Sequence, residues 1–191
     1  MRTFSSLSVA LALAAALTFT AGCGSDLGLP PPGIENRTDT VSLFALSGTP
    51  VWEPSVYIIG YRQVARSDLS AAGFDFAFDI DSLGRALLLP TGALRLATGS
   101  GIMLTQHAFD SITVAPSSGY DNDSATVVDS GSVAILHSRP TTCSFGITSI
   151  YYSKLHVLRI DTTAAQRRID FEILNNVNCG YHGLEPGLPR R

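Results

Sequence analysis

Large apolar side chains recur at every second position from residue 74 to residue 80, which is the clearest pattern in the chain. Apolar side chains occupy every second position, and Asp75 and Asp79 stand between them. Successive side chains of a β-strand point to opposite faces. This segment is therefore predicted to be a strand with one face in the core and its two aspartates in water. A turn at 82–84 and a second strand at 85–89 complete the predicted hairpin.

A second hairpin is predicted near the C-terminal end. Residues 150–160 are rich in β-branched and aromatic side chains, and residues 169–173 alternate cleanly. In an antiparallel pair the start of the first strand lies beside the end of the second. Cys143 precedes the first strand and Cys179 follows the second. Both are therefore expected at the open end of the hairpin, close enough for a disulfide.

Weaker strand signals fill the rest of the chain between residues 38 and 182, separated by clusters of Gly, Pro, Ser, Asn and Asp. No long amphipathic helix is visible there. Many short strands at irregular spacing predict an all-β domain, either an antiparallel β-sandwich or a β-barrel. The weaker candidates are 40–46, 56–61, 102–105, 112–115, 126–128 and 133–138.

The N-terminal segment follows a different pattern. An apolar run from residue 7 to residue 20 is about 14 residues long, which suits the core of a signal peptide and is shorter than the ~20 residues needed to span a bilayer. The run leads into Ala21-Gly22-Cys23, which resembles the lipobox of bacterial lipoproteins, although Thr20 stands where a larger aliphatic residue is usual. The resemblance implies a signal peptide over 1–22, cleavage before Cys23, and lipid on the cysteine sulfur.

The alternative is a soluble periplasmic protein cut by the ordinary signal peptidase. An odd thiol is awkward in an exported protein, and lipid on Cys23 leaves Cys143 and Cys179 to pair, which favours the lipoprotein. Residues 23–37 are rich in Gly and Pro and predict a flexible tether, and residues 183–191 predict a loose tail. The expected location is the bacterial cell envelope, periplasmic or surface-facing, with the membrane as a partner through the lipid anchor.

The charge of the chain narrows the choice of partner. The full chain carries a net charge of −3. Removing residues 1–22 takes away Arg2 and no acid, which gives −4 (−3 − 1). A mildly acidic domain argues against nucleic acid, whose readers carry clustered Lys and Arg. An envelope protein or a small ligand is the partner class that the composition leaves open.

Candidate chemistry is sparse. The sequence has no nucleophile elbow, phosphate-binding loop, zinc-protease motif or Cys-x-x-Cys pair, and we expect no cofactor. Two acidic groups offer oxygen ligands of the kind that calcium prefers: Asp75 with Asp79, and Asp121 with Asp123. Neither group follows a known calcium-loop spacing. We therefore interpret the first as a polar sheet face and the second as a solvated turn.

Histidines and tyrosines give further candidates. His137 and His156 fall within strand candidates, where they could form a metal or haem ligand pair or serve as hydrogen-bonded structural residues. Tyr151, Tyr152 and Tyr181 could form an aromatic patch that contacts protein or glycan, or could fill the core.

The sequence predicts a lipid-anchored envelope protein with a non-catalytic β-domain that binds a partner or has a structural role. One alternative is a small-ligand carrier, because residues 151–157 (YYSKLHV) and the strand that follows are similar to strands of HmuY-like haem-binding lipoproteins. That resemblance covers one hairpin and carries over no ligand residue. The other alternative is an envelope hydrolase that uses Asp75 and Asp79. Those carboxylates would lie about 13 Å apart along the strand, wider than the ~5–9.5 Å of a glycosidase pair.

Overall fold

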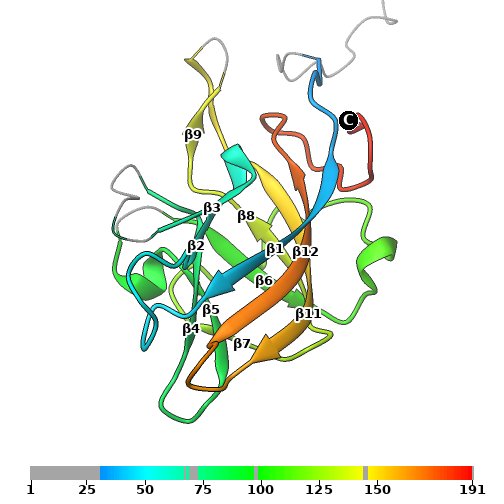
Figure 1. Ribbon diagram of the computed structural model, residues 1–191. Helices are drawn as coiled ribbons and strands as arrows, with labels where there is room; N and C mark the ends of the chain where they lie inside the picture. Colours follow the sequence, from blue (N-terminus) through cyan, green and yellow to red (C-terminus); the bar gives the residue numbers. More distant parts are fainter. Residues whose placement is uncertain (1–30, 67, 69–72, 97–98, 144–145, 191) are drawn as a thin grey trace, which may run out of the picture. The chain divides into compact units, whose positions relative to one another are not determined.

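The structure is a computed structural model that describes residues 31–66, 68, 73–96, 99–143 and 146–190. The predicted signal peptide and Cys23 lie outside these residues. Antiparallel strands form two five-stranded sheets that pack as a β-sandwich without closing into a barrel (Figure 1). The predicted all-β class is confirmed, and of its two forms the sandwich is present. No helix in the described part of the chain is long and apolar enough to cross a membrane.

The two sheets have simple strand orders. The first is β1 (Arg37–Phe44), β12 (Arg168–Asn176), β11 (Tyr152–Asp161), β8 (Val133–His137) and β6 (Gly101–Thr105). The second is β3 (Gln63–Ala65), β2 (Val56–Ile58), β4 (Phe76–Ile80), β5 (Ala86–Pro90) and β7 (Thr126–Val128). The described elements also include a small hairpin, β9 (Thr141–Thr142) with β10 (Thr148–Ser149), and three 3₁₀ turns, η1 (Ile59–Tyr61), η2 (Gly92–Leu94) and η3 (Phe109–Ser111).

Both predicted hairpins are present: β4 pairs with β5, and β11 pairs with β12. The weak candidate at 112–115 is not a strand, because only Val114 pairs there, in a single bridge with Gly183. The short strands β3, β9 and β10 were not predicted. Two or three residues are too few to show an alternation, so these strands depend on the tertiary structure for their pairing.

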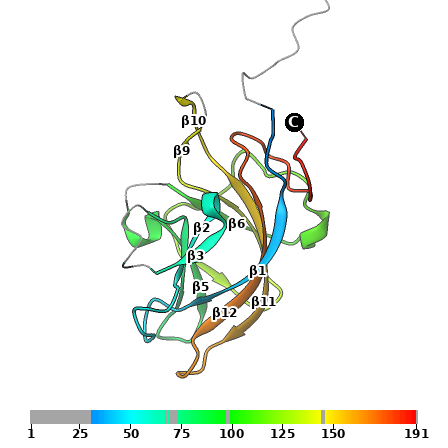
Figure 2. The same ribbon diagram turned by 45° about the horizontal axis from the view of Figure 1, so that its top comes forward.

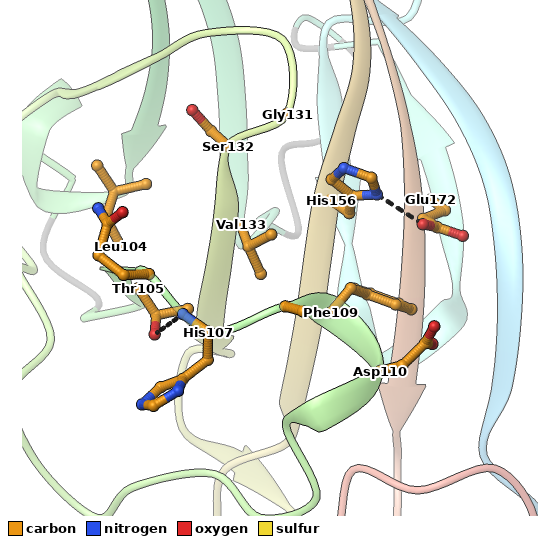
Figure 3. A pocket seen from close by; sticks show the side chains of 12 residues that line it. Leu104, Thr105, His107, Phe109, Asp110, Gly131, Ser132, Val133, His156 and Glu172 are labelled. Atoms are coloured by element: carbon orange, nitrogen blue, oxygen red, sulfur yellow. Dashed lines mark hydrogen bonds and ion pairs between the residues drawn. The ribbon is translucent and has the colours of Figure 1, made fainter.

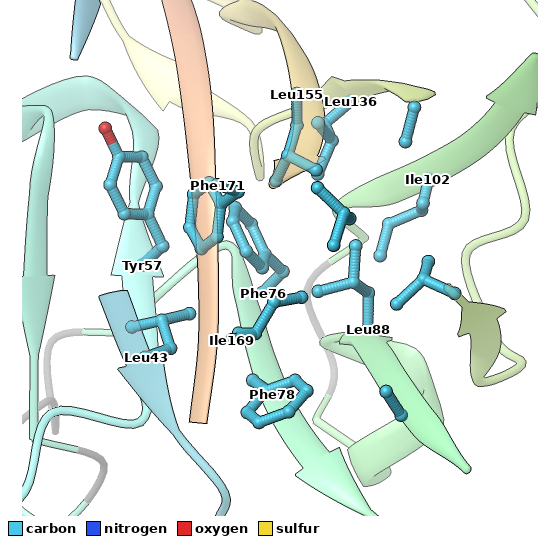
Figure 4. Packing of buried hydrophobic residues seen from close by; sticks show 14 of the residues in the cluster. Leu43, Tyr57, Phe76, Phe78, Leu88, Ile102, Leu136, Leu155, Ile169 and Phe171 are labelled. Carbon is cyan, nitrogen blue, oxygen red and sulfur yellow. The ribbon is translucent and has the colours of Figure 1, made fainter. Parts of the chain in front are cut away.

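The core lies between the two sheets and takes large apolar side chains from both (Figure 4). Phe76 of β4 packs against Phe171 of β12 with ring centroids 6.0 Å apart, and Tyr57 of β2 lies 5.4 Å from Phe76. Each of the three is at most 1% exposed. Full burial of one large apolar side chain stabilises a fold by about 1.5–3 kcal/mol. The alternation read from the sequence therefore marks the strand faces that build this core.

The aspartates of the first pattern do not share a wet face, which corrects the prediction for Asp75. Asp75 precedes β4 and is only 3% exposed. It accepts hydrogen bonds from the backbone N–H groups of Ile59 (2.7 Å) and Arg139 (2.9 Å), and it pairs with the Arg139 guanidinium at 3.4 Å. Burial raises the pKa of this carboxyl, and its hydrogen bonds and Arg139 oppose the rise. Asp79 is half-buried and accepts bonds from Ser47.

The two segments predicted to be loose pack against each other. Asn36 is buried, and its side-chain amide donates to the carbonyls of Gly183 (3.0 Å) and Glu185 (2.9 Å). Its backbone also forms a bridge with Gly187, and Leu184 is fully buried. Residues 33–37 and 183–190 therefore belong to the domain. A Gly- and Pro-rich sequence suggests a free chain, but amide side chains from elsewhere satisfy its backbone groups here.

The predicted disulfide between Cys143 and Cys179 is present, with Cα atoms 6.1 Å apart. Its position differs in one respect from the expectation. Cys143 lies between β9 and β10, in the small hairpin that projects from one end of the sandwich (Figure 2), rather than directly before β11. Cys179 follows the end of β12. The bond therefore ties a projecting arm to the segment that follows β12, the second strand of the first sheet.

Candidate functional site

The outer face of the first sheet, turned away from the core, carries side chains in regular rows. In one row, His156 of β11 lies between Glu172 of β12 and Val133 of β8, and Thr105 of β6 follows Val133. We call this the His156 row. The next row contains Leu174, Lys154, Ile135 and Met103 in the same strand order. Side chains in one row project to the same face, since residues two apart on a strand line one face.

A β-bulge decides which residue faces His156. Near the β11–β12 turn, Arg159 is opposite Asp170, but beyond the bulge Val157 is opposite Phe171 and His156 is opposite Glu172. Without the extra residue, the register of the turn would place His156 opposite Ile173. A one-residue shift of register changes which side chains meet across a strand pair. The bulge is thus the local cause of the His156–Glu172 contact.

The turn η3 covers the second row and is held there by Lys154, the only lysine in the sequence. Lys154 is 2% exposed, and its Nζ donates to the carbonyls of Phe109 and Ile112, both at 2.9 Å. The same Nζ lies 4.6 Å from the centroid of the Phe109 ring. Burial lowers the pKa of Lys154, and nearby carboxylates oppose this shift. A buried ammonium with two backbone acceptors fixes the turn to the sheet.

Between η3 and the His156 row lies a hollow of about 640 Å³ (Figure 3). Phe109 and Val133 give it an apolar floor, each 9% exposed. His156 Nδ1 and Glu172 Oε1 are 2.7 Å apart, and both side chains are about 30% exposed. The remaining lining residues are Leu104, Thr105, Gln106, His107, Ala108, Asp110, Gly131 and Ser132.

The His156–Glu172 pair lines this hollow and has two polar atoms outside its mutual hydrogen bond. Nε2 of His156 and the second carboxylate oxygen of Glu172 have no hydrogen-bond partner among the described residues. Glu172 orients the imidazole through Nδ1, which leaves Nε2 to form a hydrogen bond with a ligand. Ser132 also lines the hollow, but its hydroxyl accepts from the Asp129 N–H at 2.9 Å and points away from His156 in Figure 3. The arrangement is suited to hydrogen-bonding a ligand, and it lacks the nucleophile–base contact of covalent catalysis.

Neither the protein-family models nor the curated proteins contain a match to this sequence. Function is therefore inferred from the residues themselves.

The two histidines predicted as a ligand pair are on one face but far apart. His137 is opposite Tyr152, whereas His156 is four residues further along β11, about 13 Å at the usual rise of a strand. His137 Nδ1 donates to the Ser138 carbonyl at 2.9 Å, and its ring sits directly over Gly101, where a Cβ atom would meet Nε2 at 2.4 Å. Burial lowers the pKa of His137. His137 is therefore placed as a structural histidine.

The acidic groups predicted as calcium candidates are not brought together. Asp121 accepts hydrogen bonds from the backbone N–H groups of Asp123 and Ser124, which makes it the first residue of a turn. Asp75 and Asp79 bond to different segments, as described above. In the described ranges, no three His, Cys, Asp or Glu side chains are grouped so as to hold a metal ion.

The tyrosines do not form one patch. Tyr152 and Tyr181 are buried, and Tyr152 stacks against His182 with ring centroids 4.2 Å apart. Tyr151 is half-buried and lines a separate groove of about 770 Å³, together with Tyr61. The adjacent tyrosines 151 and 152 point to opposite sides of the sheet, as neighbours on a strand do.

Proposed function

We propose that this chain is a lipid-anchored protein of the bacterial envelope whose β-sandwich binds a small organic ligand in the hollow beside His156 and Glu172. The observation that carries the proposal is the pair of unpartnered polar atoms above an apolar floor. Ligand pockets are commonly about 300–1,000 Å³, with mostly apolar walls and a few polar groups that orient the ligand. The hollow of about 640 Å³ fits this description. The anchor rests on the lipobox-like residues 21–23.

Filling the hollow with a large side chain should displace the ligand. Ala108 is exposed and lines the hollow, so Ala108→Trp adds bulk there without disturbing the core. Wild-type protein purified from envelope extracts is expected to carry a small molecule that mass spectrometry detects after solvent extraction. The amount carried should fall at least about tenfold in Ala108→Trp, since a loss of about 1.4 kcal/mol in binding is enough for that change.

The matched control is Ala164→Trp, because Ala164 is also exposed but lies in the β11–β12 connection. It should carry the wild-type amount. Glu172→Gln, which keeps the shape of the side chain and removes its charge, should carry less. Equal recovery of the same compounds from all four proteins, or no compound from any of them, would show that this hollow is not a ligand site.

The anchor has its own test. Cys23→Ala should release a soluble, unlipidated protein or leave the precursor uncut, because the sulfur that receives the lipid is gone. Several acyl chains, at ~0.8 kcal/mol per buried CH₂, should otherwise keep the protein on the membrane. Mass spectrometry of the mature N-terminal peptide and membrane fractionation measure both effects, with Ser25→Ala as a control that should stay lipidated. An unmodified Cys23 thiol in the wild-type protein would contradict the proposal.

A haem carrier is the second candidate, and one observation favours it. Histidines that bind metals usually donate their other ring N–H to a carboxylate, and His156 has this arrangement with Glu172 while Nε2 faces the hollow. His156 would then be the axial ligand. Titration with haemin separates the candidates: a shifted Soret band that is lost in His156→Ala favours the haem carrier, and an unchanged haemin spectrum favours another organic ligand.

A further inference from the structure

A second hollow adjoins the one beside His156. It measures about 420 Å³ and shares Leu104, Thr105 and His107 with the first. The first hollow lies over the His156 row, and the second lies over Met103 and Ile135 of the next row. Its outer wall comes from the last residue of η3 and the chain that follows it: Ser111, Ile112, Thr113, Val114 and Pro116. The two hollows thus lie side by side along the edge strand β6, as two parts of one candidate site.

The two parts differ in chemistry. The first has two carboxylates, Asp110 and Glu172, together with the imidazoles of His107 and His156. The second has no ionisable group apart from the shared His107. Its rim includes two exposed apolar side chains, since Val114 is 61% exposed and Leu104 is 45% exposed. An apolar hollow beside a polar one suits a ligand that has both an apolar and a polar part.

The charged side chains that line the hollows indicate which charge the polar end of a ligand would carry. The sequence contains twelve arginines and one lysine, yet none of these side chains lines either hollow in the described part of the chain. Lys154, which lies beneath η3, is buried and already donates to two carbonyls. An anionic head would therefore meet two carboxylates without a fixed cation. A protonated amine would instead donate to the unused oxygen of Glu172 and lie near Asp110.

We infer that the ligand is a cationic amphiphile, with an amine head beside Glu172 and His156 and a hydrocarbon chain in the hollow lined by Met103, Ile135 and Val114. This inference rests on the proposed function and adds the chemical class of the ligand. Chain length should control affinity, because each buried methylene contributes about 0.8 kcal/mol, or about fourfold in affinity.

The test compares three probes on the Cys23→Ala protein recovered from the soluble fraction, which requires no detergent. Butylamine, octylamine and octanoate are titrated by calorimetry at pH 7 below their micelle concentrations. Octylamine is expected to bind roughly 20- to 200-fold more tightly than butylamine, since four more methylenes are wholly or partly buried. Octanoate is expected to bind at least about tenfold more weakly than octylamine, because its charge opposes that of Glu172.

Two variants assign the effect to the two parts of the site. Val114→Asn, which makes the second hollow more polar without adding charge, should reduce the gain from chain length and leave butylamine unaffected. Its matched control is Val127→Asn, an exposed valine on β7 of the other sheet, which should change neither affinity. Glu172→Gln should weaken both amines and leave their ratio unchanged.

The outcomes separate this inference from the proposed function. In the titrations, equal affinity for the two amines, or tighter binding of octanoate than of octylamine, overturns the inference. In the extraction experiment, a ligand recovered from wild-type protein but not from Ala108→Trp would still support the proposed function. Failure of all three probes to bind overturns the cationic amphiphile as well. The proposed function itself fails only if the extraction experiment also recovers nothing that depends on Ala108.

Discussion

Replacing both Cys143 and Cys179 by serine is expected to lower the free energy of unfolding by about 3–4 kcal/mol. The bond joins residues 36 positions apart in sequence, and a cross-link of that span removes much of the conformational freedom of the unfolded chain. Typical domains are stable by only ~5–15 kcal/mol. The loss is therefore a large fraction of the total, and urea unfolding followed by circular dichroism should show it as a lower midpoint.

Reduced wild-type protein is the natural control, because it removes the same bond without changing the sequence. Its unfolding midpoint should approach that of the double variant. The β9–β10 arm should also exchange its amide hydrogens faster in both, since the disulfide is what joins this arm to the end of β12. Identical midpoints for oxidised and reduced wild-type protein would contradict the prediction.

The second large effect is expected for Lys154→Met, with a loss of about 2–3 kcal/mol. The substitution keeps most of the apolar volume but removes the donor to the carbonyls of Phe109 and Ile112. Hydrogen bonds from a charged group contribute about 1.5–3 kcal/mol each, and relief from burying the ammonium offsets part of that loss. The turn η3 should loosen, so ligand binding in the neighbouring hollow should weaken as well.

Lys154→Met should also change how the free energy of unfolding depends on pH. Burial lowers the pKa of Lys154 in the folded protein, whereas the unfolded chain keeps the ordinary value of about 10.4. At pH values between the folded and the unfolded pKa, Lys154 binds more protons in the unfolded state than in the folded state. The free energy of unfolding of the wild-type protein therefore increases as pH rises toward 10.4. Lys154→Met lacks this contribution, and the stability gap between the two proteins should therefore widen with pH.

Urea unfolding at pH 7 and at pH 10 measures that gap. Arg159→Met is the matched control, because Arg159 is a cation on the same strand but its side chain is 71% exposed. It should change the free energy of unfolding by less than about 0.5 kcal/mol at either pH. A gap for Lys154→Met that narrows as pH rises would show that burial does not disfavour the charged lysine.

Local patterns were sufficient to predict much of the fold. The alternation at 74–80 and at 169–173 identified β4 and β12, and each short connection identified the antiparallel partner. This works because the period of side chains along a strand is a local property of the backbone. The disulfide also followed from the sequence, since only two thiols are available once Cys23 is assigned to lipid.

The candidate site could not be predicted in the same way. The contact between His156 and Glu172 depends on the bulge before Arg159, and nothing in the sequence marks that extra residue. The hollow further requires β6 to pair with β8 and η3 to fold over Lys154. These are contacts between residues distant in the chain, and alternation along one strand says nothing about which strand lies beside it.

Sequence alone thus determined the class of fold, the two hairpins and the disulfide, and it is the sole basis for proposing a signal peptide and lipidation of Cys23. Tertiary structure decided the burial of Asp75 by Arg139, the packing of residues 183–190 on Asn36, and the site beside His156. The physical reason is the same for all three. Whether a polar residue faces water or a partner depends on what covers it, and the covering segment here comes from elsewhere in the chain.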